Sequence, residues 1–163
     1  MQKIKNLDSK DIVYIDESGI DTNSTYKQRE WVHRNKTHVS QKSGKFYERL
    51  NVLAGLNGNN SIAPMVFNGH CNSEIFNCWV EQFLIPELKP GQTVIMDNAS
   101  FHKSPKTRQM IEQFGCKVVF LPPYSPDLNP IEKFWANMKR WIRGKFNQFK
   151  NLYDAFVQFF AIR

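Results

Sequence analysis

Two short, continuous apolar runs constrain the fold of this chain more strongly than any other feature. They occupy residues 93–97 and 117–121, and such runs are typical of strands that are buried on both faces of a sheet. Between them, Ser104 and Pro105 predict the cap and the first residue of a helix, and Gly115 predicts its end. Buried strands that alternate with a helix indicate an α/β sheet with helices packed on it.

Three earlier segments are rich in β-branched, aromatic and other apolar residues and predict further strands: 11–16, 49–56 and 61–67. The first is expected to end at Ser18-Gly19. The other two flank residues 57–60, which contain an Asn-Gly pair and predict a hairpin. Pro64 lacks an N–H group, so the second arm is expected at a sheet edge or at a bulge. Trp31-Val32 suggests one more short strand.

Apolar residues recur at helical spacing in three segments, which predict helices: 73–84, a stretch that starts at Asn129, and the last segment from Leu152 to Phe160. The aromatic residues on these stripes are expected in the core rather than on a base-stacking surface: Trp79, Trp135, Phe156, Phe159 and Phe160. The element order predicts a mixed sheet, antiparallel in its early strands and parallel in its later ones, flanked by helices. With 163 residues, the chain is expected to form a single domain over 1–163.

Composition narrows the class of protein. The net charge is +7 and the pI about 9.4, which suits a polyanionic partner such as DNA but does not identify one. No apolar run approaches the length of a membrane span, and the polar start carries no signal-peptide core, so a cytoplasmic protein without a membrane partner is expected. Cys71, Cys78 and Cys116 are odd in number and lack a C-x-x-C pair, so they are interpreted as small core residues rather than as disulfide or zinc ligands.

Three carboxylates stand out by their positions. Asp16 ends the first predicted strand, Asp97 ends the first buried central strand, and Glu132 opens the helix after a proline-rich loop. The carboxyl ends of strands are where sites form in α/β sheets, and a buried carboxylate is costly unless it is compensated. Oxygen ligands suit Mg²⁺ or Mn²⁺, so these residues are candidate metal ligands.

Each of these residues also has a structural interpretation. Asp16 and Asp97 could simply end strands or accept turn hydrogen bonds. Asn129 could cap the helix, Pro130 suits its first position, and Glu132 at the third position could complete a capping box.

Several neighbouring residues are candidates for accessory roles. His102 could orient a ligand or contact a phosphate, or serve as a surface or capping residue. Asn98 could assist Asp97 or make an Asx turn, whereas Glu17 should face the other side of the sheet from Asp16. Two basic groups flank the acidic residues and are candidates for guiding a phosphate backbone, although solvated helix faces are the usual explanation: Lys103, Lys106 and Arg108 in one group, and Lys133, Lys139, Arg140 and Arg143 in the other.

Three motifs together resemble the mariner-like transposases, with the bacterial insertion-sequence branch as the most similar. They are residues 16–19 (Asp-Glu-Ser-Gly), residues 95–102 from Ile95 to His102, and the long proline-rich stretch 121–132 that ends at Glu132. Between Asp97 and Glu132 lie 34 residues, which is the family's spacing. The similarity covers about residues 10–160.

The resemblance implies an RNase H-like fold and a DDE transposase. It implies two Mg²⁺ ions, with Mn²⁺ as a substitute, held by Asp16, Asp97 and Glu132. The expected reaction is DNA strand cleavage at element ends, followed by transesterification into target DNA, in this family usually at a TA step. The implied partners are element-end and target DNA.

The resemblance also bears on assembly. Relatives carry helix-turn-helix modules before the catalytic domain, which this sequence lacks, so a truncated, frameshifted or remnant chain is expected. The resemblance allows a homodimer and a separate helix-turn-helix chain from an upstream frame. Two alternatives remain: an RNase H-like nuclease acting on another nucleic acid, and an inactive DNA-binding or dimerising remnant.

Overall fold

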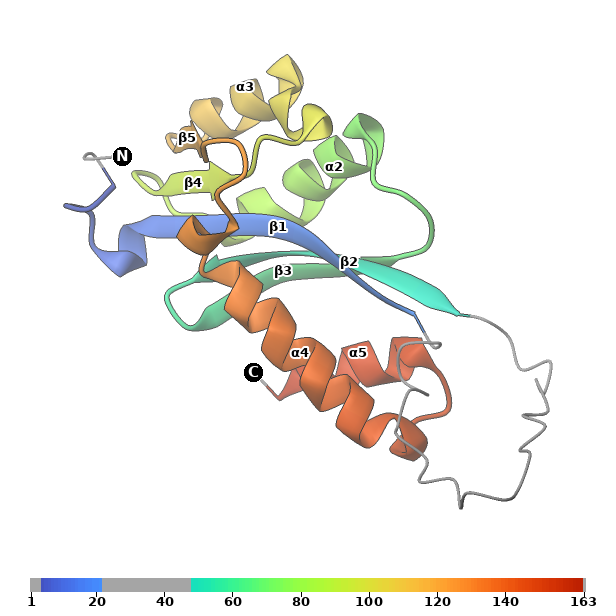
Figure 1. Cartoon of the computed structure of the whole chain (residues 1–163). Coiled ribbons are helices and arrows are strands. Elements are labelled where there is room, and N and C mark those ends of the chain that lie inside the picture. Colours follow the sequence, from blue (N-terminus) through green and yellow to red (C-terminus); the bar gives the residue numbers. More distant parts are fainter. Residues whose placement is uncertain (1–3, 22–47, 163) are drawn as a thin grey trace, which may run out of the picture.

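The computed structural model describes residues 4–21 and 48–162 (Figure 1). In this part of the chain, five strands form one mixed sheet in the order β3-β2-β1-β4-β5. Their bounds are β1 Ile12–Asp21, β2 Arg49–Asn57, β3 Asn60–Phe67, β4 Thr93–Met96 and β5 Lys117–Phe120. Strands β1, β2 and β3 pair antiparallel, and β4 pairs parallel with both β1 and β5. The predicted mixed sheet is therefore confirmed.

The hairpin β2–β3 forms as predicted. Gly58 takes a left-handed backbone at its turn, with φ 60°, a conformation that glycine adopts without steric cost. Strand β3 lies at the sheet edge, and its register with β2 shifts between Leu53 and Gly55, which is where the missing N–H of Pro64 can be tolerated. The strand suggested at Trp31-Val32 lies outside the described residues.

Strand β1 is longer than the sequence pattern predicts. The expected end at Ser18-Gly19 is wrong, because β2 pairs with β1 as far as Asp21 opposite Arg49. The parallel partner β4 covers only the first part of β1, from Ile12 to Ile15. Strand β1 thus passes from pairing with β4 to pairing with β2 along its length.

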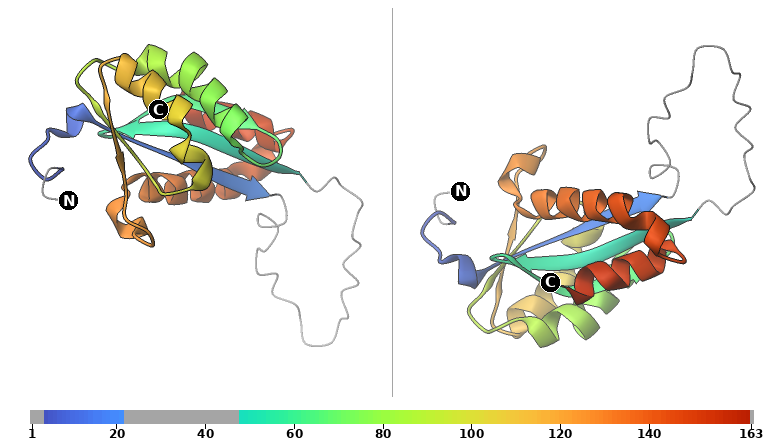
Figure 2. Two further views of the ribbon diagram at one scale, coloured as in Figure 1. Left: turned by 90° about the horizontal axis from the view of Figure 1, so that it is seen from above. Right: turned by 90° about the horizontal axis from the view of Figure 1, so that it is seen from below.

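Helices cover both faces of the sheet, with α2 and α3 on one face and α4 and α5 on the other (Figures 1 and 2). Their bounds are α2 Ser73–Trp79, α3 Pro105–Gln113, α4 Ile131–Lys145 and α5 Leu152–Ala161. The segment predicted as one helix over 73–84 is helical throughout, although a wider π turn, Val80–Leu84, follows α2. None of the helices among the described residues is long and apolar enough to cross a membrane.

The aromatic stripes form the two cores. Trp79 is buried on the α2 face of β1, while Trp135, Phe156 and Phe159 are buried on the α4 face and Phe160 packs against them partly exposed, as predicted. The prediction for the cysteines holds only in part. All three are free, but Cys116 alone is buried, Cys71 is half-buried, and Cys78 is exposed because it lies on the face of α2 turned away from the sheet.

Candidate active site

Asp16 and Asp97 lie side by side where two parallel strands separate. The pairing of β1 with β4 ends at Ile15 opposite Met96. Asp16 and Asp97 are the residues that follow this last pair, Asp16 still within β1 and Asp97 just after β4. Neighbouring strands are about 4.8 Å apart, so both carboxylates start from adjacent backbone positions. The prediction that Asp16 ends its strand needs correction, because β1 continues along β2. What ends at Asp16 is the contact with β4.

Glu132 approaches this pair from α4, where it is the second residue. One turn further along the same helix, Trp135 donates a hydrogen bond from Nε1 to Oδ2 of Asp16 over 3.2 Å. This buried contact ties the start of α4 to the centre of β1. The structure therefore brings all three predicted carboxylates to one region, from three separate elements.

The arrangement changes the pKa of Asp16. Its side chain is only 8% exposed. The pKa of Asp16 is raised to about 7, chiefly by burial and also by the charges of Asp97 and Glu132, while hydrogen bonds from the Glu17 backbone and from Trp135 oppose the rise. Negative charge is thus crowded in a place where water cannot fully solvate it.

The donor chemistry of the three carboxylates fits a divalent cation of the Mg²⁺ or Mn²⁺ type, because such ions prefer oxygen ligands. A cation would offset the repulsion that Asp16 experiences from Asp97 and Glu132. Among the described residues, no group of three or more His, Cys, Asp or Glu side chains is arranged to hold a metal ion by itself. Asp97 and Glu132 are close enough to Asp16 to act on its charge.

His102 holds the carboxylate of Asp97. Its Nδ1 lies 2.6 Å from Oδ1 of Asp97 and 3.3 Å from the Asp97 carbonyl oxygen. Both neighbours are acceptors, so Nδ1 carries the hydrogen in this contact. The hydrogen bond from His102 keeps the pKa of Asp97 below its usual range. Of the two interpretations of His102, the structure favours the one in which it orients an acidic residue, because the ring is buried and not a surface group.

The surroundings of His102 fix its ring. It is 1% exposed and packs against Phe76 and Phe101, with ring centroids 4.6 and 4.4 Å away. Its second nitrogen, Nε2, is buried without a hydrogen-bond partner in the described part of the chain. The polar contact of this side chain is therefore made through Asp97.

Asn98 lies beside Asp97, whereas Glu17 lies on the other face of the sheet. The Asx-type hydrogen bond predicted for Asn98 is made by Asp97 instead, whose Oδ1 accepts from the backbone N–H of Ala99 over 3.0 Å. Asn98 is exposed beside Asp97. Glu17 lies on the opposite face from Asp16, as expected, and burial raises its pKa while a hydrogen bond from Cys71 lowers it.

The capping-box interpretation of Glu132 is wrong. The backbone N–H of Asn129 donates to the carbonyl oxygen of Pro126 over 3.0 Å, because a 3-10 turn, Pro126–Leu128, precedes the helix. The N–H that a capping glutamate would bind is thus already used. Helix α4 also begins at Ile131, one residue later than predicted. Asn129 still contributes its side chain, which accepts from the N–H of Ile131 over 3.4 Å.

Two cavities meet at Glu132. The first, here called the proline-loop cleft, has a volume of about 440 Å³ and lies between the end of β4 and the loop before α4. Its lining comprises Asp97, Asn98, Ala99, Leu121, Pro122, Pro123, Tyr124, Ser125, Pro126, Asn129 and Glu132. The second, the α4 groove, has a volume of about 480 Å³ and follows one face of that helix. It is lined by Glu132, Trp135, Ala136, Lys139, Arg140 and Arg143.

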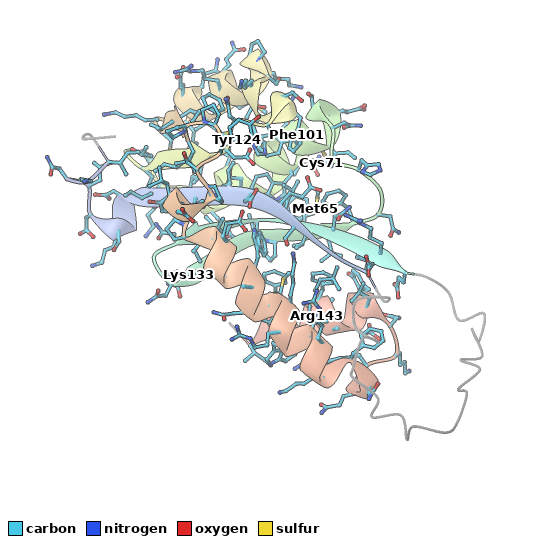
Figure 3. All side chains as sticks on the ribbon, viewed as in Figure 1. Met65, Cys71, Phe101, Tyr124, Lys133 and Arg143 are labelled. Atoms are coloured by element: carbon cyan, nitrogen blue, oxygen red, sulfur yellow. The ribbon has the colours of Figure 1, made fainter. Side chains whose placement is uncertain are left out.

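Only one of the two predicted basic groups lines a cavity. Lys139, Arg140 and Arg143 line the α4 groove together with Glu132; Figure 3 labels Lys133 near the start of this helix and Arg143 toward its far end. In the other group, Lys103, Lys106 and Arg108 are exposed and line neither cavity. Arg108 forms an ion pair with Glu112 over 2.8 Å.

A mixed sheet in this strand order, with acidic side chains at the open end of its central parallel pair, is the arrangement expected of an RNase H-like nuclease domain. Residues 11–153 match the family described as DDE superfamily endonuclease, and the chain belongs to that family.

Similar proteins agree with this assignment. The Tc1 transposase of Caenorhabditis elegans is 29% identical over 89 residues, which cover 50% of this chain and 33% of that protein. A Mos1 transposase paired-end complex with the left transposon end aligns with a TM-score of 0.68 at 16% identity, over 99% of this chain and 51% of that one. The Mos1 catalytic domain with raltegravir and Mn aligns with a TM-score of 0.64 at 16% identity, over 99% and 76%.

These comparisons confirm the predicted RNase H-like fold and the resemblance to mariner-type transposases. The chain spans about a third of the Tc1 transposase and about half of the Mos1 chain in the paired-end complex.

The raised pKa of Asp16 predicts how stability depends on pH. The folded protein binds an extra proton between about pH 4 and 7, because the unfolded side chain ionises near 3.8. The free energy of unfolding should therefore fall as pH rises through this window. In metal-free protein, Asp16→Asn should remove this contribution and raise stability above pH 7 by up to about 4 kcal/mol, with little difference from the parent below pH 4. Urea denaturation in EDTA at pH 4, 5.5 and 7.5 measures it.

Asp11→Asn, which removes an exposed carboxylate just before β1, is the matched control and should leave the pH profile unchanged. Equal stability of the parent and Asp16→Asn at all three pH values would show that burial of Asp16 carries no such cost.

The His102 contact predicts a change in the titration of Asp97. His102→Gln places its amide near the former Nε2 and removes the donor to Asp97, so the pKa of Asp97 should rise. His102→Asn places its amide near Nδ1 and should preserve the lowered pKa. Carboxyl ¹³C chemical shifts followed over pH in the metal-free protein measure both, with near-UV circular dichroism to verify folding. An identical Asp97 titration in all three proteins would contradict the assignment.

Proposed function

We propose that this chain is the catalytic domain of a mariner-type DNA transposase, which cuts DNA strands at the ends of a mobile element and joins them to target DNA. The observation that carries the proposal is the meeting of Asp16, Asp97 and Glu132 at the point where β1 leaves β4, within a DDE superfamily endonuclease domain. The three acids come from a central strand, a parallel neighbour and a covering helix. This arrangement suits a site built to hold cations against a phosphodiester.

The three carboxylates would hold two divalent ions, Mg²⁺ or Mn²⁺. When bound, such ions supply an activated water or 3′-hydroxyl and stabilise the leaving oxygen. The Mn-containing Mos1 catalytic domain supports this choice of metal. His102 keeps Asp97 oriented and ionised, and Trp135 gives Asp16 a hydrogen-bond donor in a buried place. These contacts engage Oδ2 of Asp16 and Oδ1 of Asp97.

The α4 groove is the proposed path of a DNA strand to the acids. Lys139, Arg140 and Arg143 follow Glu132 on one helical face, and the 11 residues from Glu132 to Arg143 extend about 16 Å along the axis. Positive charge along this face would neutralise phosphates next to the one being cut. The exposed Lys103, Lys106 and Arg108, on the α3 side, are proposed contacts for flanking DNA, and Asn98 for a phosphate in the proline-loop cleft.

We propose that recognition of element ends needs more than this domain, because the match with each similar transposase covers only about a third to a half of that protein. We propose that a helix-turn-helix chain supplies this recognition and that two copies act together on paired ends. The Mos1 paired-end complex, which contains a transposon end, supports DNA as the partner. By itself, the domain should bind DNA weakly and with little sequence preference.

Replacement of Glu132 tests the catalytic assignment. Glu132→Gln keeps the size of the side chain but removes the charge that a metal ligand needs, so Mg²⁺- or Mn²⁺-dependent nicking of plasmid DNA should be lost. Stability should change by no more than about 0.5 kcal/mol, since no capping bond depends on this residue. Asp127→Asn is the matched control, because Asp127 is an exposed acid in the turn just before α4 that lines neither cavity.

If Glu132→Gln nicks DNA as fast as the parent and with the same metal requirement, Glu132 is not a metal ligand. Profiling on RNA, RNA–DNA hybrid and DNA separates the transposase proposal from a nuclease that acts on another nucleic acid. Binding of DNA without any metal-dependent cleavage would instead indicate an inactive remnant.

Neutralising charges in the α4 groove tests the DNA path. The double variant Lys139→Gln/Arg140→Gln should weaken binding to duplex DNA and reduce the slope of log affinity against log salt by about 1.8, or roughly 0.9 per lost phosphate contact. Fluorescence anisotropy at several salt concentrations measures the slope. Lys89→Gln/Lys117→Gln removes the same charge from exposed positions outside both cavities and should change it little. Equal losses in both double variants would mean that only net charge matters.

A further inference from the structure

Tyr124 is the residue of the proline-loop cleft whose properties the proposed function leaves unexplained. Its side chain is fully exposed, at 102%, whereas Tyr153 on α5 is 53% exposed. Its backbone is left-handed, with φ 56°, and among the described non-glycine residues only Ala63 shares a positive φ. Exposure of an aromatic ring and a left-handed backbone at a residue with a Cβ are both unfavourable for the folded chain. Stability therefore does not account for a tyrosine at this position.

The loop around Tyr124 is held at several points. The N–H of Leu121 donates to the carbonyl oxygen of Met96 over 2.8 Å, which fixes the start of the loop to the end of β4. Pro122 and Pro123 precede Tyr124, and Pro126 follows it two residues later. Prolines restrict their own φ angles and the conformations of the residues before them. The ring is thus presented on a stiff support, so less conformational freedom is lost when something binds to it.

The position of Tyr124 relates it to the acids. It lines the proline-loop cleft together with Asp97 and Glu132, and Figure 3 labels it on the segment between β5 and α4. The proline-loop cleft and the α4 groove meet at Glu132, so a DNA strand that follows the α4 groove to the carboxylates reaches the cleft that this ring borders. The bases on either side of that phosphodiester are the nearest flat, apolar groups that the strand carries.

We propose that the ring of Tyr124 stacks on an unpaired base of the DNA strand, next to the phosphodiester held at the carboxylates. Aromatic side chains form such platforms without sequence preference, because every base has a π face. Bases inside a duplex already stack on one another, so the platform serves strand ends, nicks and gaps, which are the products and substrates of cutting and joining. This inference rests on the proposed function, since it assumes a DNA strand in the cleft.

A two-way comparison of protein and DNA tests the contact. The parent and Tyr124→Ala are each titrated, with Ca²⁺ in place of Mg²⁺, against a duplex that ends in a short single-stranded overhang. A second duplex has the same overhang with abasic sites in place of the bases. Stacking of one base contributes an amount that corresponds to about a 5- to 150-fold change in affinity. Tyr124→Ala should show this loss on the base-bearing overhang and little loss on the abasic one, while Tyr124→Phe should bind like the parent.

Tyr124→Gly separates stacking from folding, because glycine accepts the left-handed backbone. This variant should melt at the same temperature as the parent or higher, yet lose affinity as Tyr124→Ala does. Tyr153→Ala is the control for loss of an exposed tyrosine elsewhere and should bind both duplexes like the parent.

Three results would overturn the inference. They are equal affinity of the parent and Tyr124→Ala for the base-bearing overhang, an equal loss on both overhangs, and a loss that accompanies a change in oligomeric state measured by light scattering. The last would assign Tyr124 to a contact between copies of the chain. Metal-dependent nicking by the parent, measured in parallel, keeps these results distinct from failure of the proposed function, because a parent that nicks DNA can still lack the stacking contact.

Discussion

The organisation of this domain depends on the short parallel pairing between β1 and β4. These strands pair over only four residues, after which β1 continues with β2 alone. The separation creates an opening inside the sheet, and the backbone carries Asp16 and Asp97 into it. Carboxylates between continuously paired strands would lose far more hydration. At the opening they remain close to solvent on one side, while α4 covers the other side and brings both Trp135 and Glu132.

Strand β1 also lies between the two helical layers and contributes side chains to both. Residues on one face of β1, such as Val13 and Ile15, pack under α2 and α3, while Ile20 on the other face packs against α4 and α5. Asp16 points toward α4 and Glu17 toward α2, so two adjacent acidic residues lie in different surroundings. Asp16 interacts with the other two acids, and Glu17 with Cys71 and the nearby histidines. Strand alternation alone separates these residues.

Much of the fold could be predicted because its signals are local. The apolar runs of β4 and β5, the Asn-Gly turn of the β2–β3 hairpin and the helical stripes of α4 and α5 all depend on short-range periodicity. The full length of β1 could not be predicted in this way, because Glu17, Ser18 and Gly19 do not resemble strand residues and are held by pairing with β2. The start of α4 is not evident from the sequence because the turn Pro126–Leu128 takes the N–H of Asn129. The exposure of Cys78 depends on how α2 is rotated against the sheet.

The three acidic residues of the candidate site could be predicted from the sequence, but the side chains that contact them could not. Asp16, Asp97 and Glu132 stand at predicted element ends and in recognisable motifs, and their assignment as ligands stays a prediction. The grouping of Lys139 and Arg140 with Glu132 follows from helical periodicity. The contact between His102 and Asp97 depends on the turn that connects them, and burial of His102 between two phenylalanine rings has no local signal.

The hydrogen bond between Trp135 and Asp16 joins residues that are 119 positions apart. Such a contact can close only after most of the chain has been synthesised, and contacts between residues distant in sequence are slow to form. During synthesis, a nascent chain that ends before α4 has the first two acids but neither Glu132 nor the indole that supports Asp16. During synthesis, the acidic centre therefore cannot be complete before α4 has been made and has docked onto the sheet.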